Sequence, residues 1–167
     1  EICILELDDS DMKEINKINE TVHFLSDTID DFRGFFKPDK EKEKFEISSC
    51  YENTLKIVNS KFKSLQINVV ENTQELEILG LENELKQVLM NIINNSKDAL
   101  VQNSIEEKYI FVDIYEEKEK VVIEIKDNAN GVPLSIMDKI FEPYFTTKRE
   151  LNGTGIGLYM SMEMVQK

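Results

Sequence analysis

A glycine-rich run near the end of the chain, Gly153–Leu158, is the pattern with the clearest chemical potential. An apolar segment typical of a helix follows it directly. Glycines let the backbone approach a ligand closely, and the free N–H groups at the start of a helix favour negative charge. The run therefore predicts a cradle for phosphate groups. Its residues are Gly153, Thr154, Gly155, Ile156, Gly157 and Leu158.

Two commoner glycine motifs do not fit this run. A P-loop needs Gly-Lys-Ser/Thr after its first glycine and four further residues, and the chain has no such sequence. A dinucleotide fingerprint needs a third glycine where this chain has Leu158, and a strand directly before the run. Here the preceding segment is Phe141–Lys148, which reads Phe-Glu-Pro-Tyr-Phe-Thr-Thr-Lys. Taken alone, the glycines are more typical of an ordinary flexible loop, so other parts of a site must support them.

Polar side chains crowd one stretch of a predicted helix upstream. Asn91, Asn95 and Asp98 are separated by four and then three residues, so a helix would place them on one face. Asparagine is a mediocre helix former, and several in a helix interior reduce stability unless they bind something. A solvated polar face is one interpretation. Amide and carboxylate oxygens also suit Mg²⁺, which takes few protein ligands and keeps several waters.

An acidic residue at the end of a predicted strand could recognise a base. Asp127 precedes the turn sequence Asn-Ala-Asn-Gly-Val-Pro, and its carboxylate could accept a hydrogen bond from the exocyclic amine of adenine. Guanine has a carbonyl there, so this acid would select ATP over GTP. An ordinary surface turn is the alternative. Downstream, Lys148 and Arg149 could neutralise terminal phosphate charge, although a lone lysine is usually solvated surface.

The elements that must hold these residues alternate between helices and strands. Apolar residues at helical spacing predict a helix over residues 82–101 and another over 48–64, with Ser48 as its N-cap. Alternating apolar and polar residues predict four strands, paired as 67–69 with 76–78 and as 109–115 with 121–126. This order predicts an α+β fold, an α/β sandwich with helices layered on one face of a mixed sheet.

The N-terminal part of the chain has the apolar spacing of a helix that pairs with another helix. From Ile15 to Phe36 the apolar residues follow at alternating steps of three and four, and Pro38 ends the pattern. Such a narrow stripe predicts a helical hairpin or a dimeric bundle. The only histidine, His23, lies beside the stripe without an adjacent acid, so we interpret it as an ordinary flank residue. Residues 39–46 form a charged connector.

The overall composition limits the partners of the protein. Its 167 residues carry a formal net charge of −13, which argues against binding nucleic acid or an anionic membrane surface through bulk charge. Cys3 and Cys50 are far apart and suggest neither a disulfide framework nor a metal site. No apolar stretch approaches the length of a membrane span, and the signal-peptide pattern is missing. We therefore expect a soluble cytoplasmic domain, with any membrane anchor in upstream segments of a parent protein.

Together, four of these segments resemble the ATP-binding catalytic domain of bacterial sensor histidine kinases. This domain belongs to the superfamily of gyrases, chaperones, histidine kinases and mismatch-repair proteins, which share the Bergerat-type fold. The four similar segments are the N box at 91–100, the first glycine box at 127–131, the F box at 141–148 and the second glycine box at 153–158. In the first glycine box, Ala129 stands where that family usually has glycine.

The resemblance also implies a domain plan. The heptad helix resembles the second helix of the family's dimerisation and phosphotransfer hairpin, so residues 1–38 would be part of that hairpin. Residues 39–46 would be a charged linker, and 47–167 would be the catalytic domain, truncated at its C-terminal end. The parent protein would form a homodimer through the heptad helix.

The resemblance further implies roles for individual residues. Asn95 would be the main Mg²⁺ ligand, and Asn91 would lie near the metal and the phosphates as a catalytic residue. Asp127 would bind the adenine amine, and Gly131 would leave space under the ring. Lys148 would contact the γ-phosphate as the second catalytic residue. The remaining nucleotide-binding residues would be Asp98, Ala129, Arg149 and the six residues of the glycine run.

The implied function is phosphoryl transfer in a two-component system. Mg·ATP would phosphorylate a histidine on the dimerisation hairpin, and the phosphate would then pass to an aspartate of a response regulator. The family's acceptor-histidine motif is absent from the chain, so we expect no self-phosphorylation in cis. Asn91 replaces the glutamate that activates water in related ATPases, which favours a kinase. The alternatives are a gyrase- or chaperone-like ATPase and a non-catalytic ATP-binding dimerisation module.

Overall fold

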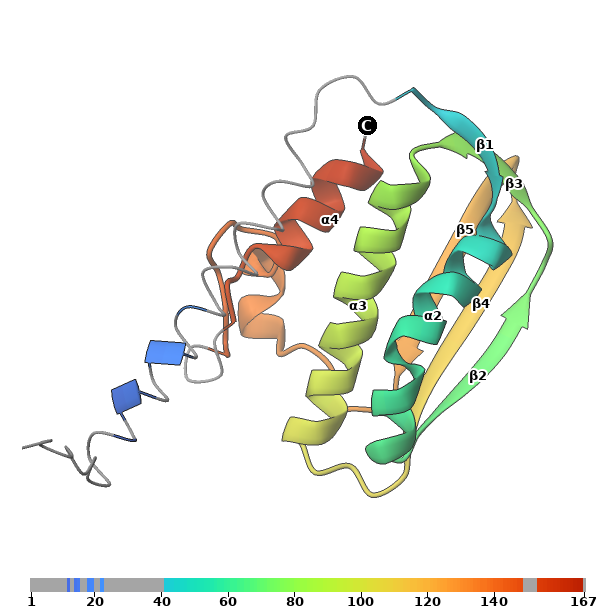
Figure 1. Cartoon of the computed structure of the whole chain (residues 1–167). Helices are drawn as coiled ribbons and strands as arrows, with labels where there is room; N and C mark the ends of the chain where they lie inside the picture. The colour runs from blue at the N-terminus through green and yellow to red at the C-terminus, as the bar shows by residue number, and fades with distance from the viewer. Residues whose placement is uncertain are drawn as a thin grey trace, which may run out of the picture.

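The structure is a computed structural model, which describes residues 12, 14, 15, 18, 19, 22, 41–148 and 153–166 (Figure 1). Its helices and strands follow one another in an alternating order along the chain. They are β1 (Glu43–Glu46), α2 (Ile47–Ser64), β2 (Ile67–Thr73), β3 (Glu77–Gly80), α3 (Glu82–Gln102), β4 (Lys108–Glu117), β5 (Lys120–Asp127), the 3₁₀-helix η1 (Leu134–Lys139) and α4 (Gly157–Val165).

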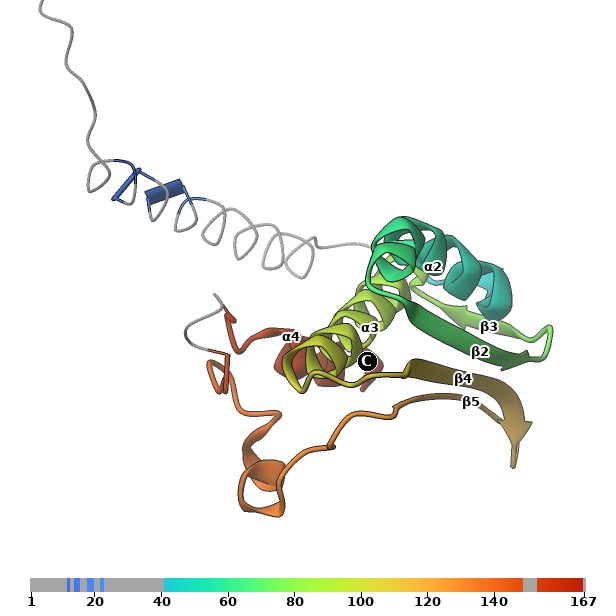
Figure 2. The same ribbon diagram turned by 90° about the horizontal axis from the view of Figure 1, so that it is seen from below.

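The strands form two small sheets. The larger sheet has the order β2-β4-β5, with β2 parallel to β4 and β4 antiparallel to β5. The smaller sheet is the antiparallel pair β1-β3. Helices α2 and α3 cover one face of the strands, and α4 lies beside α3 (Figures 1 and 2). These features confirm the predicted α+β fold with helices on one face of a mixed sheet.

The predicted hairpin between β4 and β5 is confirmed, and its turn has two residues. Glu117 pairs with Lys120, so only Lys118 and Glu119 connect the strands. Both connecting residues have positive φ, 51° and 62°. This is the pattern of a type I′ turn, whose twist matches the twist of two antiparallel strands. The turn forms without the glycine or asparagine that usually favours these angles.

The predicted pairing of residues 67–69 with 76–78 is wrong. Strand β2 pairs with β4 instead, with Ile67 opposite Lys108, and β3 pairs with β1, with Ile78 opposite Phe45. A parallel pair needs a long crossover connection, and here β3 and the whole of α3 supply it. Local alternation marked the strands correctly, but their partners depend on where the crossover helix packs.

Two boundaries near α2 also differ from the expectations. Residues 43–46, expected within the charged linker, form β1, in which Phe45 packs against the core while Glu43 and Lys44 stay exposed. Helix α2 begins at Ile47 with Glu46, not Ser48, as its N-cap. Ser48 lies inside the first turn, where its hydroxyl donates to the Glu46 carboxylate, and Ser49 donates to the same carboxylate at 3.0 Å.

The main core lies between the larger sheet and helices α2 and α3. Alternate residues of β4 point inward, and the residues between them are more exposed, as the period of two in a strand requires. On the outer face, Tyr109 and Phe111 stack with ring centroids 6.0 Å apart. The largest fully buried side chains of the core are Tyr51, Phe62, Ile47, Leu89, Ile93, Leu100, Ile110, Ile114 and Val112.

A second, smaller apolar cluster joins α4 to α3. Val88 of α3 is buried against Met160 and Met164 of α4, and Ile156 just before α4 completes the buried set. The cluster occupies a different side of α3 from the residues that face the sheet. Helix α3 is therefore the central element, packed on strands by one face and on α4 by another (Figure 1).

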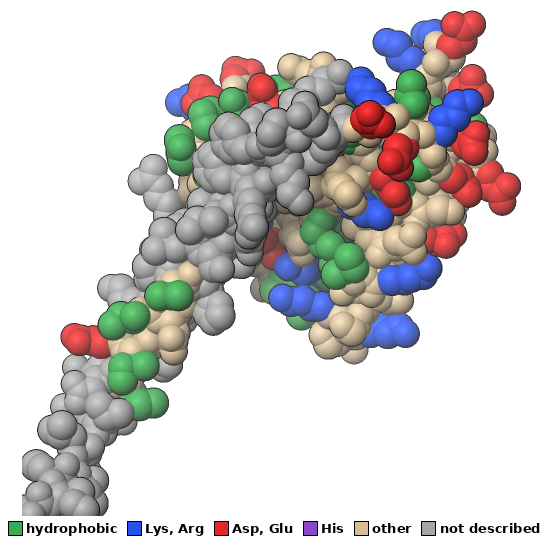
Figure 3. Space-filling view, turned by 45° about the horizontal axis from the view of Figure 1, so that its top comes forward, with side chains coloured by type: hydrophobic (Ala, Val, Ile, Leu, Met, Phe, Trp, Pro, Cys, Tyr) green, Lys and Arg blue, Asp and Glu red, His purple; other side chains and the backbone are tan. Residues whose placement is uncertain are grey.

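The described N-terminal residues have helical backbone and expose apolar side chains. Ile15, Ile18 and Val22, three positions of the predicted heptad stripe, are all exposed. On the face shown in Figure 3, acidic and basic side chains both spread over the domain. The rest of the predicted stripe, together with His23, lies outside the described residues. Within the described part of the chain, no helix is both long and apolar enough to span a membrane.

Candidate functional site

The polar residues of α3 share one face, as their spacing predicts, and they contact residues far away in sequence. Asn91 contacts the start of α4, whereas Asn95 and Asp98 contact the end of the F-box segment (residues 141–148). The opposite side of α3 carries buried residues such as Leu89 and Ile93, which hold the helix on the sheet. Asn91 and Asn95 therefore do not simply face solvent, because both contact other segments of the chain.

Lys148 makes the contacts between the F-box segment and the polar face of α3. Its ammonium donates to the amide oxygen of Asn95 at 3.2 Å and to Oδ2 of Asp98 at 2.9 Å. The other carboxylate oxygen of Asp98 lies 3.1 Å from the ammonium of Lys97, a partner that sequence reasoning missed. Burial alone would raise the pKa of Asp98, but hydrogen bonds and charge from Lys148 and Lys97 outweigh it and hold the pKa below its ordinary value.

The backbone around Lys148 is arranged by local hydrogen bonds. The Lys148 amide donates to Oγ1 of Thr146 at 3.0 Å, which forms a tight turn at the end of the F-box segment. The Lys148 carbonyl accepts from the Gly153 amide at 3.1 Å, so the chain returns to the same place after four residues. The structure thereby places the predicted lysine beside the predicted glycine run. Arg149, the second predicted cation, lies outside the described residues.

Two glycines of the run are required by close backbone packing. Gly155 has φ of +68°, and a Cβ there would lie 2.5 Å from the Tyr144 carbonyl carbon and 2.7 Å from the Phe145 oxygen. A Cβ on Gly153 would lie 2.6 Å from the Thr146 hydroxyl. The glycine run is therefore packed directly on the F-box segment, an arrangement that only a residue without a side chain allows.

Gly157 is different, because its surroundings leave room for a side chain. A Cβ there would meet the Asn91 side chain at 3.6 Å or more, which is ordinary van der Waals contact. Just before it, Oγ1 of Thr154 accepts from the Ile156 amide at 3.3 Å, and Ile156 is buried in the α3–α4 cluster. The last two residues of the run, Gly157 and Leu158, already belong to the first turn of α4.

Asn91 binds α4 through its side-chain amide nitrogen, which contacts two neighbouring acceptors. Its Nδ2 donates to the Gly157 carbonyl at 3.2 Å and to the Ser161 hydroxyl at 3.3 Å. Ser161 in turn donates to the same Gly157 carbonyl at 2.9 Å. Sequence reasoning missed Ser161, although a serine one helical turn after Gly157 in the apolar run Leu-Tyr-Met-Ser-Met was a usable signal.

Asp127 lies at the carboxyl end of β5, half-buried, and begins a structured turn. Its Oδ1 accepts from the Ala129 amide at 3.0 Å, which leaves the second carboxylate oxygen for another donor. Asn128 ties the turn to β4, because its side-chain oxygen accepts from the Tyr109 amide at 2.8 Å. Gly131 has φ of +70° and open space where a Cβ would be. The turn is therefore fixed on the sheet, while the second oxygen of the Asp127 carboxylate has no hydrogen-bond partner among the described residues.

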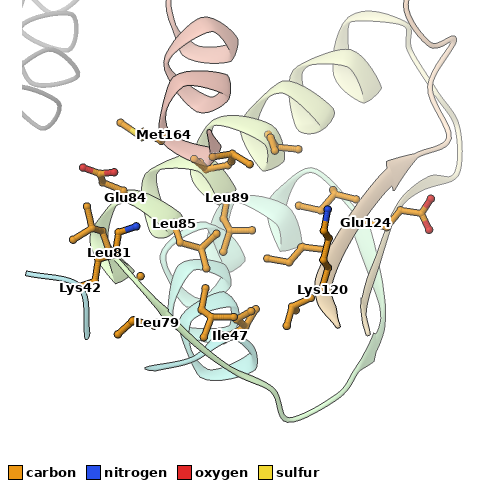
Figure 4. A pocket seen from close by; sticks show the side chains of 18 residues that line it. Lys42, Ile47, Leu79, Leu81, Glu84, Leu85, Leu89, Lys120, Glu124 and Met164 are labelled. Carbon is orange, nitrogen blue, oxygen red and sulfur yellow. The ribbon is translucent and has the colours of Figure 1, made fainter. Parts of the chain in front are cut away.

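A large apolar cavity lies elsewhere in the domain and contains none of the predicted site residues. It measures about 830 Å³ and lies between β3, the first half of α3, β5 and the end of α4 (Figure 4). Aliphatic side chains such as Leu85, Leu89 and Met164 point into it, and Lys120 and Glu124 lie on its β5 side. The candidate site and this cavity are therefore separate.

The oxygens around Lys148 suit a cation. Asn95 supplies a neutral amide oxygen and Asp98 a carboxylate oxygen, and both accept from the same ammonium. Such a donor set matches the few oxygen ligands that Mg²⁺ takes from a protein, with phosphates and water completing its shell. Among the described residues, no three His, Cys, Asp or Glu side chains cluster closely enough to hold a metal ion by themselves.

The fold and the site together define a class of protein. A mixed sheet covered on one face by helices, whose polar helix face meets a glycine loop and a lysine, is characteristic of ATPase-like nucleotide-binding domains. Residues 80–167 match the family of histidine kinase-, DNA gyrase B-, and HSP90-like ATPases, and the chain belongs to this family. The resemblance derived from the four sequence boxes is thereby confirmed.

Individual relatives point to the histidine kinase branch. The chain is similar to the signal transduction histidine-protein kinase AtoS of Escherichia coli (strain K12), with 31% identity over 157 residues, which covers 92% of this chain and 24% of AtoS. The chain thus spans about a quarter of the length of this relative.

Solved structures of histidine kinases share the fold. Full-length ShkA in complex with AMPPNP has a TM-score of 0.71 at 16% identity, covering 97% of this chain and 35% of ShkA. The histidine kinase ThkA in complex with the response regulator protein TrrA has a TM-score of 0.69 at 21% identity, covering 86% of this chain and 42% of ThkA.

Proposed function

We propose that this chain is the ATP-binding catalytic part of a sensor histidine kinase, which positions Mg·ATP for phosphoryl transfer to a histidine. The observation that carries the proposal is the contact of Lys148 with Asn95 and Asp98 beside the glycine run. Three of the four segments that resemble the family's boxes, the N box, the F box and the second glycine box, are thus in contact. Membership of the family and the similarity to AtoS support the same conclusion.

Asp127 would recognise the adenine base. Its carboxylate has one oxygen engaged by the Ala129 amide and a second oxygen that can accept from the exocyclic amine. The open space at Gly131 would admit the edge of the ring. Guanine would present a carbonyl to this carboxylate, and two facing acceptors repel each other. The site would therefore prefer ATP to GTP.

The phosphates would bind between α3 and the glycine run. Asn95 would be the main protein ligand of Mg²⁺, with Asn91 nearby, and Mg²⁺ when bound would neutralise phosphate charge. Lys148 would move its ammonium from Asn95 toward the γ-phosphate, and Asp98 would keep that lysine in the site through the ion pair. The backbone of residues 153–158 would wrap the phosphates. Phosphoryl transfer depends mainly on such positioning and charge neutralisation.

Transfer to a protein histidine is favoured over ATP hydrolysis. A general base that activates water would have to occupy the position of Asn91, and an amide cannot accept a proton at neutral pH. The amide nitrogen of Asn91 also donates to α4, at the Gly157 carbonyl and the Ser161 hydroxyl. The chain would therefore hold the phosphoryl donor without directing it to water.

The parent protein would act in a two-component system. ThkA was solved with a response regulator protein, and by analogy the phosphate would pass onward to an aspartate of such a regulator. The heptad stripe, of which Ile15, Ile18 and Val22 are described and exposed, would form a homodimer in the cytoplasm. No partner is proposed among nucleic acids.

The proposed function is tested by nucleotide titration of this chain in a calorimeter. We expect Mg·ATP to bind and Mg·GTP to bind at least tenfold more weakly, because one mismatched hydrogen bond to a charged group costs about 1.4 kcal/mol or more. Equal affinity for the two nucleotides would contradict the role of Asp127. Steady phosphate release from ATP at gyrase-like rates would support the ATPase alternative instead.

A complementary experiment tests transfer itself. Incubation of the chain with γ-labelled ATP should give no acid-labile label on the chain. Added dimerisation hairpin from the parent protein, carrying its acceptor histidine, should become labelled. Nucleotide binding without any label on that hairpin would favour a non-catalytic ATP-binding module.

A further inference from the structure

Ser161 forms a polar contact inside an otherwise apolar helix interface. Its side chain is buried, with 4% of its surface exposed, on the face of α4 that packs against α3. Around it, Val88, Met160 and Met164 form the apolar cluster of that interface. A buried hydroxyl is costly unless it is hydrogen-bonded, and this one is bonded on both sides, as donor to Gly157 and as acceptor from Asn91.

Apolar packing alone cannot fix the orientation of the Asn91 amide. Hydrophobic contacts are non-directional, whereas a hydrogen bond constrains both distance and angle. The Gly157 carbonyl and the Ser161 hydroxyl both accept from Nδ2 of Asn91, and because these two oxygens are only 2.9 Å apart they lie on the same side of the amide nitrogen. An amide turned the other way would lose both partners and bring Oδ1 against the Gly157 carbonyl, which cannot donate. Its oxygen Oδ1 is then the atom left for any other ligand.

We propose that Ser161 is a positioning residue, which holds the Asn91 amide so that Oδ1 faces the metal and phosphates of bound Mg·ATP. This inference rests on the proposed function, because it needs a nucleotide beside Asn91. Ser161 does not touch the nucleotide itself. It acts through Asn91, and it links the orientation of an N-box side chain to the helix that begins in the glycine run (Figure 1).

A merely structural role would give Ser161 a different signature. Thr54 on α2 offers the comparison, because its buried hydroxyl donates to the Cys50 carbonyl at 2.9 Å, one turn earlier in its own helix. Ser161 makes the equivalent bond to Gly157 and, in addition, the bond to Asn91. Loss of either hydroxyl should lower the stability of the domain. Only the loss at Ser161 should lower the affinity for ATP in a way that depends on Mg²⁺.

The test measures binding of ATP with Mg²⁺ and of ATP with EDTA, by calorimetry, together with thermal unfolding. The variants are Ser161→Ala and the matched control Thr54→Val. We expect Ser161→Ala to weaken Mg·ATP binding about three- to tenfold, the loss typical of one neutral hydrogen bond, and to change metal-free ATP binding less than about twofold. Thr54→Val should leave both affinities unchanged. Both variants should unfold at somewhat lower temperature.

A double-variant experiment tests whether Ser161 acts through Asn91. In an Asn91→Ala background the amide is gone, so Ser161→Ala should cause no further loss of Mg·ATP affinity. Additive losses would overturn the proposal, as would equal weakening with and without Mg²⁺ or unchanged Mg·ATP affinity. If Ser161→Ala does not fold, Ser161→Cys replaces it, with a smaller loss of the same Mg²⁺-dependent kind expected. Absence of Mg·ATP binding by the unaltered chain would contradict the proposed function instead.

Discussion

The ammonium of Lys148 lies 2.9 Å from the carboxylate of Asp98, and this ion pair joins the end of the F-box segment to the N-box helix α3. The same ammonium also donates to Asn95. The Lys148 ammonium therefore already occupies the Asn95 oxygen that is proposed to bind Mg²⁺. Binding of Mg·ATP must release Lys148 from Asn95, and the flexible stem of a lysine lets its ammonium turn toward phosphate while Asp98 retains it.

Replacement of Lys148 by methionine should separate the contribution of this lysine to the stability of the domain from its contribution to ATP binding. Its side chain is 22% exposed and that of Asp98 is 36% exposed, so we expect a loss of unfolding free energy of about 1 kcal/mol or less. ATP affinity should fall about tenfold or more, because a charged hydrogen bond to the γ-phosphate is lost. ADP affinity should change little. Calorimetric titration with both nucleotides measures the difference.

The matched control is Lys97→Met, which removes the other ammonium from the same carboxylate. It should destabilise the domain to a similar extent and leave the ratio of ATP to ADP affinity unchanged. If Lys148→Met weakened ATP and ADP binding equally, Lys148 would be a partner of Asp98 only, without a role at the γ-phosphate.

Asp127→Asn should weaken ATP binding by about 1.5–3 kcal/mol, the value of a hydrogen bond to a charged group. The turn itself should persist, because an asparagine oxygen can still accept from the Ala129 amide. Asp138→Asn, an exposed position in η1, is the control with the same change of charge. Unchanged nucleotide affinity of Asp127→Asn would remove this residue from the site, and discrimination against GTP should weaken along with ATP binding.

The features predicted well from the sequence are those set by local periodicity. Helix α3 follows from a wide apolar face over residues 82–101, and the β4–β5 hairpin follows from two alternating runs around a charged turn. The shared face of Asn91, Asn95 and Asp98 needs only helical geometry. Family resemblance singled out Lys148 and the glycine run, which the structure brings together, and their binding of phosphate stays a prediction.

What the sequence could not reveal depends on contacts between distant segments. The pairing of β2 with β4 arises from the path of the crossover helix, and residues 67–69 carry no mark of that partner. The ion pair of Lys148 with Asp98 depends on the path of the F-box segment. This segment is irregular, so its sequence has no helical or strand periodicity from which its position could be predicted. The bond of Asn91 to Ser161 joins two helices whose relative rotation is set by packing of the whole α3–α4 interface.

Cys50 should be almost unreactive in the folded domain. The thiol is fully buried, and burial, reinforced by the Glu82 carboxylate, raises its pKa to about 11. Because only the thiolate reacts with disulfide reagents, labelling at pH 8 should be slower than in the unfolded chain by two orders of magnitude or more. A Cys3→Ser variant leaves one thiol to be counted. Rapid native labelling would mean that α2 opens locally.

The same thiol should make stability depend on pH. Its pKa is higher in the folded than in the unfolded chain, so its contribution is complete below about pH 9 and is lost as the pH rises toward about 11. Denaturant titrations across this window should show a slope that is smaller in Cys50→Ala. An identical slope in the variant would mean that the Cys50 thiol ionises alike in both states.

Two glycines of the second glycine box should respond oppositely to alanine. Gly155→Ala forces a Cβ onto the Tyr144 backbone at a φ of +68°, so the loop must move away from the F-box segment. Strain of this kind costs about 1–3 kcal/mol, and Mg·ATP affinity should fall together with the melting temperature.

Gly157→Ala lies in the first turn of α4 with ordinary contacts to Asn91, and alanine is the better helix former. Its melting temperature should be unchanged or higher, so any loss of Mg·ATP affinity there would report contact with the phosphates and not a damaged fold. An unchanged melting temperature of Gly155→Ala would show that the close packing of Gly155 on Tyr144 is not maintained in solution.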